Sequence, residues 1–258
     1  MSNCTLELST LQLAKVLNLV ETIKLDDPTN TFEKIRNQLF NYLFVLDFES
    51  TCWEPNDKNR AAPEIIEFSV VLYSISKNEI ISEFQQYVMP IERPHLSIFC
   101  QEFTGITQEK VDNGVPLGTC LMVLGKWIND MKSLHGIVFT EEKDSKRKNA
   151  TFVTWSDWDL NVCLQKECQR KRIFKPEIFN RWIDLRALYK EHYQRKPKGL
   201  KGALSELGLC FEGREHCGLH DARNTANLAA KMIKEGVLLK ITKDLSDKKT
   251  PQTGIKKE

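Results

Sequence analysis

The densest run of apolar side chains lies in residues 42–50, which read YLFVLDFES. A run of this kind, closed by acidic residues, is typical of a strand that is buried on both faces and ends at the edge of a sheet. Two β-rich stretches follow, Ile65–Ile75 and Ile80–Met89, and the turn-like residues 76–78 separate them. The pattern predicts a hairpin that lies antiparallel to the first strand.

Apolar residues at helical spacing flank these strands. In residues 6–25 they predict an amphipathic helix, which the sequence Asp26-Asp27-Pro28 ends. Residues 141–149 are predicted to form a charged surface insertion, and the polar tail from Lys243 is expected to be frayed. Further helices are predicted at 32–40, 97–103, 117–131, 160–168, 203–207 and 222–233, and further strands at 151–155 and 179–185.

The order of these elements is a strand meander followed by helices that alternate with strands. It predicts an α/β fold with a central mixed β-sheet flanked by helices. We expect a helical extension at 1–40, the folded domain at 41–243 and a flexible tail at 244–258. Ligands of such sheets bind at the carboxyl ends of the strands, so the acidic end of the 42–50 strand marks a candidate site.

Composition narrows the class of protein. With 41% hydrophobic and 28% charged residues among 258, the chain is neither disordered, collagen-like nor a coiled coil, and a net charge of +2 excludes a protein that is basic overall. No apolar run approaches the roughly 18 residues of a membrane span, and no secretory signal pattern begins the chain. Eight cysteines without a CxxC pair favour reduced thiols. We therefore expect an intracellular protein, cytoplasmic or nuclear, without a membrane partner.

Two acidic side chains share one face at the end of the 42–50 strand. Asp47 and Glu49 are two residues apart, so their carboxylates point the same way. Like charges side by side repel each other, and a hard divalent cation such as Mg²⁺ or Mn²⁺ relieves the repulsion because it prefers oxygen ligands. A solvated strand end is the alternative interpretation.

Two later segments add acidic residues. In WSDWD, residues 155–159, Asp159 begins a predicted helix and can combine a capping role with ligation, whereas Asp157 is better interpreted as an N-cap alone. Trp158 can stack on a nucleobase, with a place in the core as the alternative. Asp221 begins another predicted helix, five residues after a histidine in a glycine-punctuated loop.

That histidine, His216, is the candidate base. Imidazole suits proton transfer near neutral pH, and a base on a mobile loop can approach a metal-bound water without binding the metal. His220 is the competing candidate. Four carboxylates can hold two cations about 3.5–4 Å apart, an arrangement used for in-line attack on a phosphodiester.

The stretches FVLDFEST, FTGIT, WSDWD and EHCGLHDARNTA resemble the motifs of the DEDD-type 3′→5′ exonucleases of the histidine subtype. More narrowly, they are similar to the ERI exoribonucleases. The resemblance covers roughly residues 42–243. It implies an RNase H-like fold, two Mg²⁺ or Mn²⁺ ions, and release of nucleotides from the 3′ ends of RNA or DNA.

The resemblance also implies a role for individual residues. Asp47, Glu49, Asp159 and Asp221 match the family's metal ligands, and His216, with Glu49, matches its catalytic residues. His220 departs from the family, because many relatives have an acid there. The implied substrate contacts are Phe48, Ser50, Thr51, Thr104, Gly105, Ile106 and Trp158.

A basic segment supports a nucleic-acid partner. Residues 166–201 contain twelve basic and four acidic residues, a net charge of +8, with aromatic residues between them. Basic residues interleaved with aromatic ones suit a groove that follows a nucleic-acid strand, and a solvated helix face is the alternative. The predicted phosphate contacts are Arg195, Lys196, Lys198 and Lys201.

Two other functions stay open at this point. One is a non-catalytic RNA-binding adaptor that keeps the fold, although all five catalytic residue types are present. The other is a dedicated DNA exonuclease, because discrimination of the sugar depends on contacts to the 2′-hydroxyl that no motif reports. No protein partner can be predicted from the sequence.

Overall fold

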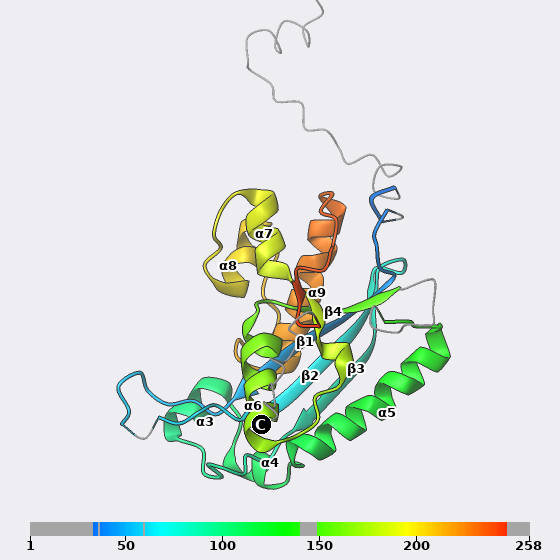
Figure 1. Cartoon of the computed structure of the whole chain (residues 1–258). Coiled ribbons are helices and arrows are strands. Elements are labelled where there is room, and N and C mark those ends of the chain that lie inside the picture. Colours follow the sequence, from blue (N-terminus) through cyan, green and yellow to red (C-terminus); the bar gives the residue numbers. More distant parts are fainter. Residues whose placement is uncertain (1–32, 36, 59, 140–148, 247–258) are drawn as a thin grey trace, which may run out of the picture. The chain divides into compact units, whose positions relative to one another are not determined.

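A mixed sheet stands at the centre of the fold (Figure 1). The computed structural model describes residues 33–35, 37–58, 60–139 and 149–246, and six strands lie within these ranges. In the order in which they cross the sheet, the strands are β3 (Glu79–Tyr87), β2 (Ile65–Ser74), β1 (Tyr42–Ser50), β4 (Ala150–Thr154), β5 (Arg181–Asp184) and β6 (Lys243–Asp244).

The strand directions place two carboxyl ends side by side. β1 pairs antiparallel with β2, and β2 pairs antiparallel with β3, so the predicted hairpin is confirmed. On its other side β1 runs parallel to β4, and β4 runs parallel to β5. The α/β class with a mixed sheet is confirmed, and β1 and β4 end at the same edge because parallel strands point the same way.

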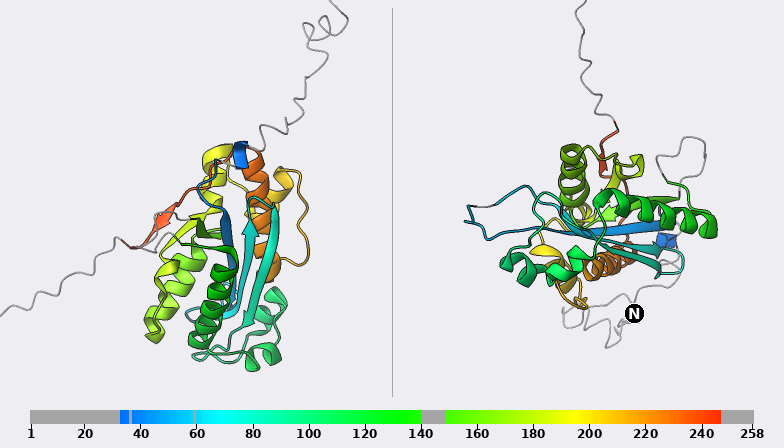
Figure 2. Two further views of the ribbon diagram at one scale, coloured as in Figure 1. Left: turned by 90° about the vertical axis from the view of Figure 1, so that its right-hand side faces the viewer. Right: turned by 90° about the horizontal axis from the view of Figure 1, so that it is seen from below.

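Helices cover both faces of the sheet, and α5 and α9 lie on opposite sides of it (Figure 2). Phe44 and Leu46 of β1 pack under one set of helices, and Leu43 and Val45 pack under the other. The unbroken apolar run of β1 follows from this double covering. The first set is α5 (Leu117–His135), the π-helix η1 (Trp158–Leu164) and α6 (Gln165–Lys171), and the second is α7 (Leu185–Tyr193), α8 (Gly199–Glu206) and α9 (Gly218–Lys234).

A smaller core attaches α3 (Ile98–Thr104) and α4 (Gln108–Asp112) to the sheet around Ile66. Ser97 caps α3 and donates its hydroxyl to the carbonyl of Cys52 at 2.7 Å. The bond fastens α3 beside the segment that leaves the carboxyl end of β1. None of the helices in the described ranges combines the length and apolar character that a membrane crossing needs.

Some predicted elements differ from the structure. The helix expected at 32–40 is helical only at 33–35 among its described residues. The strand expected at 179–185 is shortened to β5, because the 3₁₀ turn η2 (Glu177–Phe179) precedes it. The sequence pattern does not predict α4, which is a single short turn capped by Thr107, or α7, whose apolar face lies among charged residues.

The tail expected to be frayed from Lys243 instead begins with β6, which pairs with β5. An ion pair between Arg181 and Asp244 at 2.7 Å supports the pairing. The helix predicted at 6–25 and residues 141–148 of the insertion lie outside the described residues. The division of the chain into an extension, a domain and a tail stays a prediction.

A buried ionic network holds α6 against β2. Lys171 lies between Glu64 (2.7 Å) and Glu167 (2.5 Å), and no side chain of the three is more than 4% exposed. Glu64 also accepts hydrogen bonds from the backbone N–H groups of Ile91 (2.8 Å) and Arg93 (2.7 Å). Because α6 continues η1 directly, the network also fixes the helix that begins at the end of β4.

Replacing Lys171 by Met should destabilise the protein strongly. The methionine fills a similar volume but leaves Glu64 and Glu167 buried without a counter-ion, and losing one partner of a buried ion pair typically costs about 3–5 kcal/mol. Urea unfolding measures the change. Lys166→Met, at an exposed position of the same helix, is the matched control and should change stability by less than about 0.5 kcal/mol. Equal stability of the two variants would contradict the role of the network.

Candidate active site

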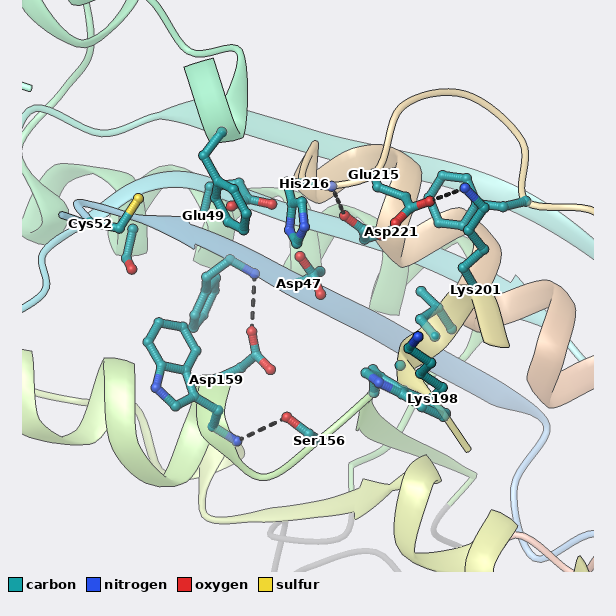
Figure 3. Close-up of a pocket in the computed structure, with 18 residues that line it drawn as sticks. Asp47, Glu49, Cys52, Ser156, Asp159, Lys198, Lys201, Glu215, His216 and Asp221 are labelled. Carbon is teal, nitrogen blue, oxygen red and sulfur yellow. Dashed lines mark hydrogen bonds and ion pairs between the residues drawn. The ribbon is translucent and has the colours of Figure 1, made fainter. Parts of the chain in front are cut away.

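A cavity of about 580 Å³ lies at the carboxyl ends of β1 and β4 (Figure 3). The end of β1, the start of η1, part of α8 and the loop that leads into α9 form its walls. All five residues predicted to hold metal or to act as the base line this one cavity. They are Asp47, Glu49, Asp159, His216 and Asp221.

Three of the carboxylates converge. Asp47, Glu49 and Asp221 each present an oxygen, and these three oxygens lie within 4.8 Å of one another. Asp47 and Glu49 alternate with Leu46 and Phe48 along β1 and therefore face α9. Asp221 meets them because it lies in the first turn of that helix, which packs against β1.

Asp159 reaches the cavity from the end of β4. Its Oδ1 accepts a hydrogen bond from the backbone N–H of Phe48 at 3.1 Å, which ties η1 to β1. Asp157 instead forms an ion pair with Lys243 at 2.7 Å. Asp159, rather than Asp157, therefore lines the cavity with the other three carboxylates.

Burial and mutual repulsion favour the protonated form of these acids. Desolvation, reinforced by the charge of Asp221, raises the pKa of Glu49 to about 9. Desolvation also raises the pKa of Asp159 and of Asp221 to about 7, and it raises the pKa of Asp47, which the charge of Asp159 raises further. An oxygen donor set that lacks a counter-charge fits a hard divalent cation.

A fifth carboxylate holds α9 in place. Glu67 is buried on β2 and accepts hydrogen bonds from the side chains of Ser69 (2.9 Å) and Gln85 (2.7 Å) and from the backbone N–H of Gly218 (3.1 Å). The N-cap residue of α9, Cys217, makes no side-chain capping bond, so Glu67 satisfies the helix start in its place. A charged residue inside the apolar run of β2 is the signal that would have identified it.

His216 lies beside the metal-type carboxylates. Its backbone N–H donates to Oδ2 of Asp221 at 2.8 Å, and its backbone adopts a φ of 62°, a left-handed conformation that is uncommon outside glycine. Its ring stacks on Phe103, with 3.8 Å between the ring centroids. Desolvation lowers the pKa of His216, which favours a neutral imidazole.

The predicted substrate residues are divided among several places. Phe48, Ser50 and Trp158 line the main cavity. Thr51 lines a neighbouring cavity of about 460 Å³, which shares Ser50 and Trp158. The turn formed by Thr104, Gly105 and Ile106 lines neither of these cavities and instead caps α3. Phe103, the first residue of the FTGIT stretch, lines the main cavity although it is not among the predicted substrate contacts.

The basic segment is also divided. Lys198 and Lys201 line the main cavity, and Lys201 forms an ion pair with Glu215. The guanidinium of Arg195 pairs with Glu206 at 2.8 Å and lies over the Tyr193 ring, outside the cavity lining. Lys196 does not line the cavity. The phosphate contacts of all four basic residues stay predictions.

Comparison with known proteins gives a consistent result. A family model described as "Exonuclease" matches residues 44–229. The chain is 50% identical over 244 residues to ERI1 exoribonuclease 2 of Homo sapiens, an alignment that covers 93% of this chain and 35% of the relative. It is 40% identical over 269 residues to the 3′-5′ exonuclease Snipper of Drosophila melanogaster, covering 92% of this chain and 95% of the relative.

Solved structures resemble the same domain. The nuclease domain of 3′hExo, described as a DEDDh family member bound to rAMP, is 35% identical with a TM-score of 0.70, covering 80% of this chain and 98% of that chain. The cell-death related nuclease CRN-4 is 23% identical with a TM-score of 0.69, covering 79% of this chain and 68% of that chain, and shows the shared fold. The RNase H-like exonuclease fold is therefore confirmed. The chain spans about a third of the length of the first curated relatives.

Replacing Glu49 by Gln should stabilise the metal-free protein. The Glu49 pKa of about 9 exceeds its ordinary value of 4.5, so between these values the folded state holds a proton that the unfolded state has released. The carboxylate therefore opposes folding in that range, and the gain should be absent near pH 4 and grow toward about pH 8. A gain of about 1 kcal/mol corresponds to a rise in Tm of about 2–4 °C.

Thermal unfolding in the presence of a chelator measures this gain. Glu79→Gln, at an exposed position of β3, is the control and should leave Tm nearly unchanged at both pH values. A lower Tm for Glu49→Gln at about pH 8 would contradict the repulsion argument.

Proposed function

This chain belongs to the DEDDh exonuclease family, in the branch of the ERI exoribonucleases, and from that membership we propose that it releases nucleotides one at a time from the 3′ ends of RNA. The observation that carries the proposal is that four carboxylates and His216 line one cavity. The chain spans about a third of the length of its first curated relatives, so the activity of those longer proteins is a proposal for this chain.

The carboxylates are the residues that would hold divalent cations. Asp47, Glu49 and Asp221 face the cavity from one side and Asp159 from the other, a number of ligands that suits two ions. The all-oxygen donor set favours Mg²⁺ or Mn²⁺. Such ions, when bound, lower the pKa of a water molecule and neutralise the charge that develops on a leaving oxygen.

His216 is proposed as the general base. Its lowered pKa leaves the imidazole free to accept a proton, and its backbone bond to Asp221 keeps the ring next to the ligands. The attacking water forms a bond to the phosphorus of the last phosphodiester as His216 takes its proton. The bond from phosphorus to the 3′ oxygen of the preceding nucleotide breaks and that oxygen takes up a proton from solvent, which leaves a nucleoside 5′-monophosphate and a new 3′ hydroxyl.

Aromatic side chains would seat the terminal nucleoside. Trp158 is 38% exposed and Phe103 is 41% exposed, and both line the cavity that contains the carboxylates. Stacking on such rings is worth about 1–3 kcal/mol per base and tolerates any sequence. Phe48 and Ser50 of β1 line the same cavity, so this part of the strand is the proposed contact to the sugar.

RNA is the proposed substrate because the relatives are named as exoribonucleases and two related structures are described with rAMP and with a histone mRNA stem-loop. Discrimination between RNA and DNA depends on contacts to the 2′-hydroxyl, which makes DNA the informative comparison substrate.

A digestion series tests the proposal. Oligoribonucleotides and matching oligodeoxynucleotides, labelled at the 5′ or the 3′ end, single-stranded or with 3′ overhangs, are incubated with and without Mg²⁺. We expect a ladder that shortens from the 3′ end and stops when a chelator is added. RNA binding without release of mononucleotides would instead identify a non-catalytic adaptor, and release from DNA alone would identify a DNA exonuclease.

Replacing His216 by Ala should lower the rate of nucleotide release about 10²–10⁴-fold, the usual contribution of a positioned proton acceptor, with little change in RNA affinity. The rising limb of the wild-type pH–rate profile should disappear in this variant. Single-turnover kinetics over a range of pH measure both effects.

His220 is the comparison residue for that experiment. Its Nδ1 accepts a hydrogen bond from the backbone N–H of Arg214 at 3.0 Å, so His220→Ala should perturb the loop but keep the rising limb. A profile in which His220→Ala loses the limb and His216→Ala keeps it would show that the base is misassigned.

Replacing Lys198 and Lys201 together by Ala should weaken RNA binding and flatten its salt dependence. Each lost phosphate contact lowers the slope of log K against log salt by about 0.7 for a single strand. Binding of an RNA oligonucleotide at several salt concentrations measures the slope. The control pair is Lys126→Ala with Lys132→Ala on α5, across the sheet from α9. Equal slopes for the two double variants would remove Lys198 and Lys201 from the RNA path.

A further inference from the structure

In the loop that carries His216, each of residues 213–216 contacts another part of the protein. Gly213 packs on His220 so closely that an added Cβ would lie 2.7 Å from its ring. Glu215 pairs with Lys201 of α8, and the His216 N–H donates to Asp221. These contacts fix the loop to α8 and α9.

Arg214 makes the contact to the other wall of the cavity. Its Nη2 donates to the carbonyl of Glu102 at 2.6 Å and to the carbonyl of Phe103 at 3.3 Å. Both carbonyls belong to the last turn of α3, where a helix leaves its acceptors without intrahelical partners. The arginine therefore joins the His216 loop to the end of α3, two segments that are remote in sequence.

Gly105 makes room for this arginine. It ends α3 with a φ of 72°, and a Cβ at this position would lie 1.3 Å from Nη1 of Arg214. Glycine satisfies both requirements at once, because it adopts the left-handed conformation without strain and leaves the space open. Thr104 and Ile106 are fixed around it by the Thr104 hydroxyl, which accepts from the N–H of Ile106 at 3.1 Å.

The end of α3, to which Arg214 binds, also contacts the proposed base and lines the main cavity. Phe103, whose carbonyl accepts from Arg214, stacks its ring on His216 and lines the main cavity. Arg214 itself is absent from the cavity lining and instead lines a smaller cavity with Gly105 and His220. Arg214 is thus placed to influence the reaction through the position of His216.

We propose that Arg214 is a positioning residue, which clamps the His216 loop to the end of α3 and so sets the imidazole against Phe103 and the carboxylates. The proposal rests on the function proposed above. It explains how a histidine in a strained left-handed conformation is kept in one place, since such conformations persist only where surrounding contacts determine them. It also means that the end of α3, through Phe103, contributes to the placement of the base.

Kinetics of Arg214→Ala test the proposal, with a single-stranded RNA oligonucleotide and Mg²⁺. We expect kcat to fall about 10–100-fold, the scale of loss that a displacement of about 1 Å produces, and the affinity for the RNA to stay within about twofold. Arg223→Ala is the matched control, because Arg223 is an exposed arginine of α9 whose partner is Glu83, outside the cavity. Its kcat should equal that of the wild type.

A double-mutant cycle separates positioning from a general structural role. If Arg214 acts only through His216, then adding Arg214→Ala to His216→Ala should lower the rate no further, whereas independent effects would multiply. Hydrogen exchange gives a readout without activity. The amides of 213–217 should exchange faster in Arg214→Ala, and those of β1 and β4 should not change.

Three results would overturn the proposal. The first is a wild-type kcat for Arg214→Ala. The second is a loss of RNA affinity at unchanged kcat, which would make Arg214 a phosphate ligand. The third is a full additional loss of rate when Arg214→Ala is added to His216→Ala. A failure of the proposed function is distinguishable from these, because the wild-type protein would then release no nucleotide while the exchange experiment would still report on the clamp.

Discussion

The structure is organised around carboxylates that repel one another at the end of β1. Asp47, Glu49 and Asp221 approach within 4.8 Å, and their surroundings raise the pKa of each of them. An arrangement of this kind lowers the stability of the metal-free protein, and it persists because the rest of the fold holds the three side chains in place. A divalent cation, when bound, offsets this repulsion. The folding free energy that holds the carboxylates together therefore also prepares a site for a metal ion.

The elements that hold the carboxylates pack into the two main cores of the described residues. β1 is covered on both faces, so the positions of Asp47 and Glu49 are fixed by the packing of the apolar residues between them. α9 is held by its apolar stripe and by Glu67, whose buried carboxylate satisfies the start of the helix. η1 is held by the Phe48 N–H and, through α6, by the network around Lys171. Each of the four carboxylates thus rests on a rigid element, which gives a site its geometric definition.

The proposed base is held in a different way. His216 lies in an exposed loop, and polar contacts made by its neighbours, together with the stacking of its ring on Phe103, determine its position. The glycines at 213 and 218 suggest a loop that swings, yet in the structure both are close-packed: Gly213 against His220, and Gly218 against Glu67 and Ser69.

The sequence by itself determined the fold class and the chemical identity of the site. The period of two along β1 places Asp47 and Glu49 on one face, and the order of strands and helices predicts a mixed sheet, since both follow from local geometry and burial.

Only the tertiary structure decided what brings the remaining groups together. Asp221 reaches the strand pair because α9 packs on β1, Glu67 caps that helix from β2, and Arg214 binds the carbonyl groups at the end of α3. These contacts join segments that are far apart in the chain, and the spacing of residues within a segment carries no information about them. The same reason explains the short strand β6. Its polar residues match no strand pattern, and it forms because β5 offers an open edge and Arg181 offers a partner for Asp244.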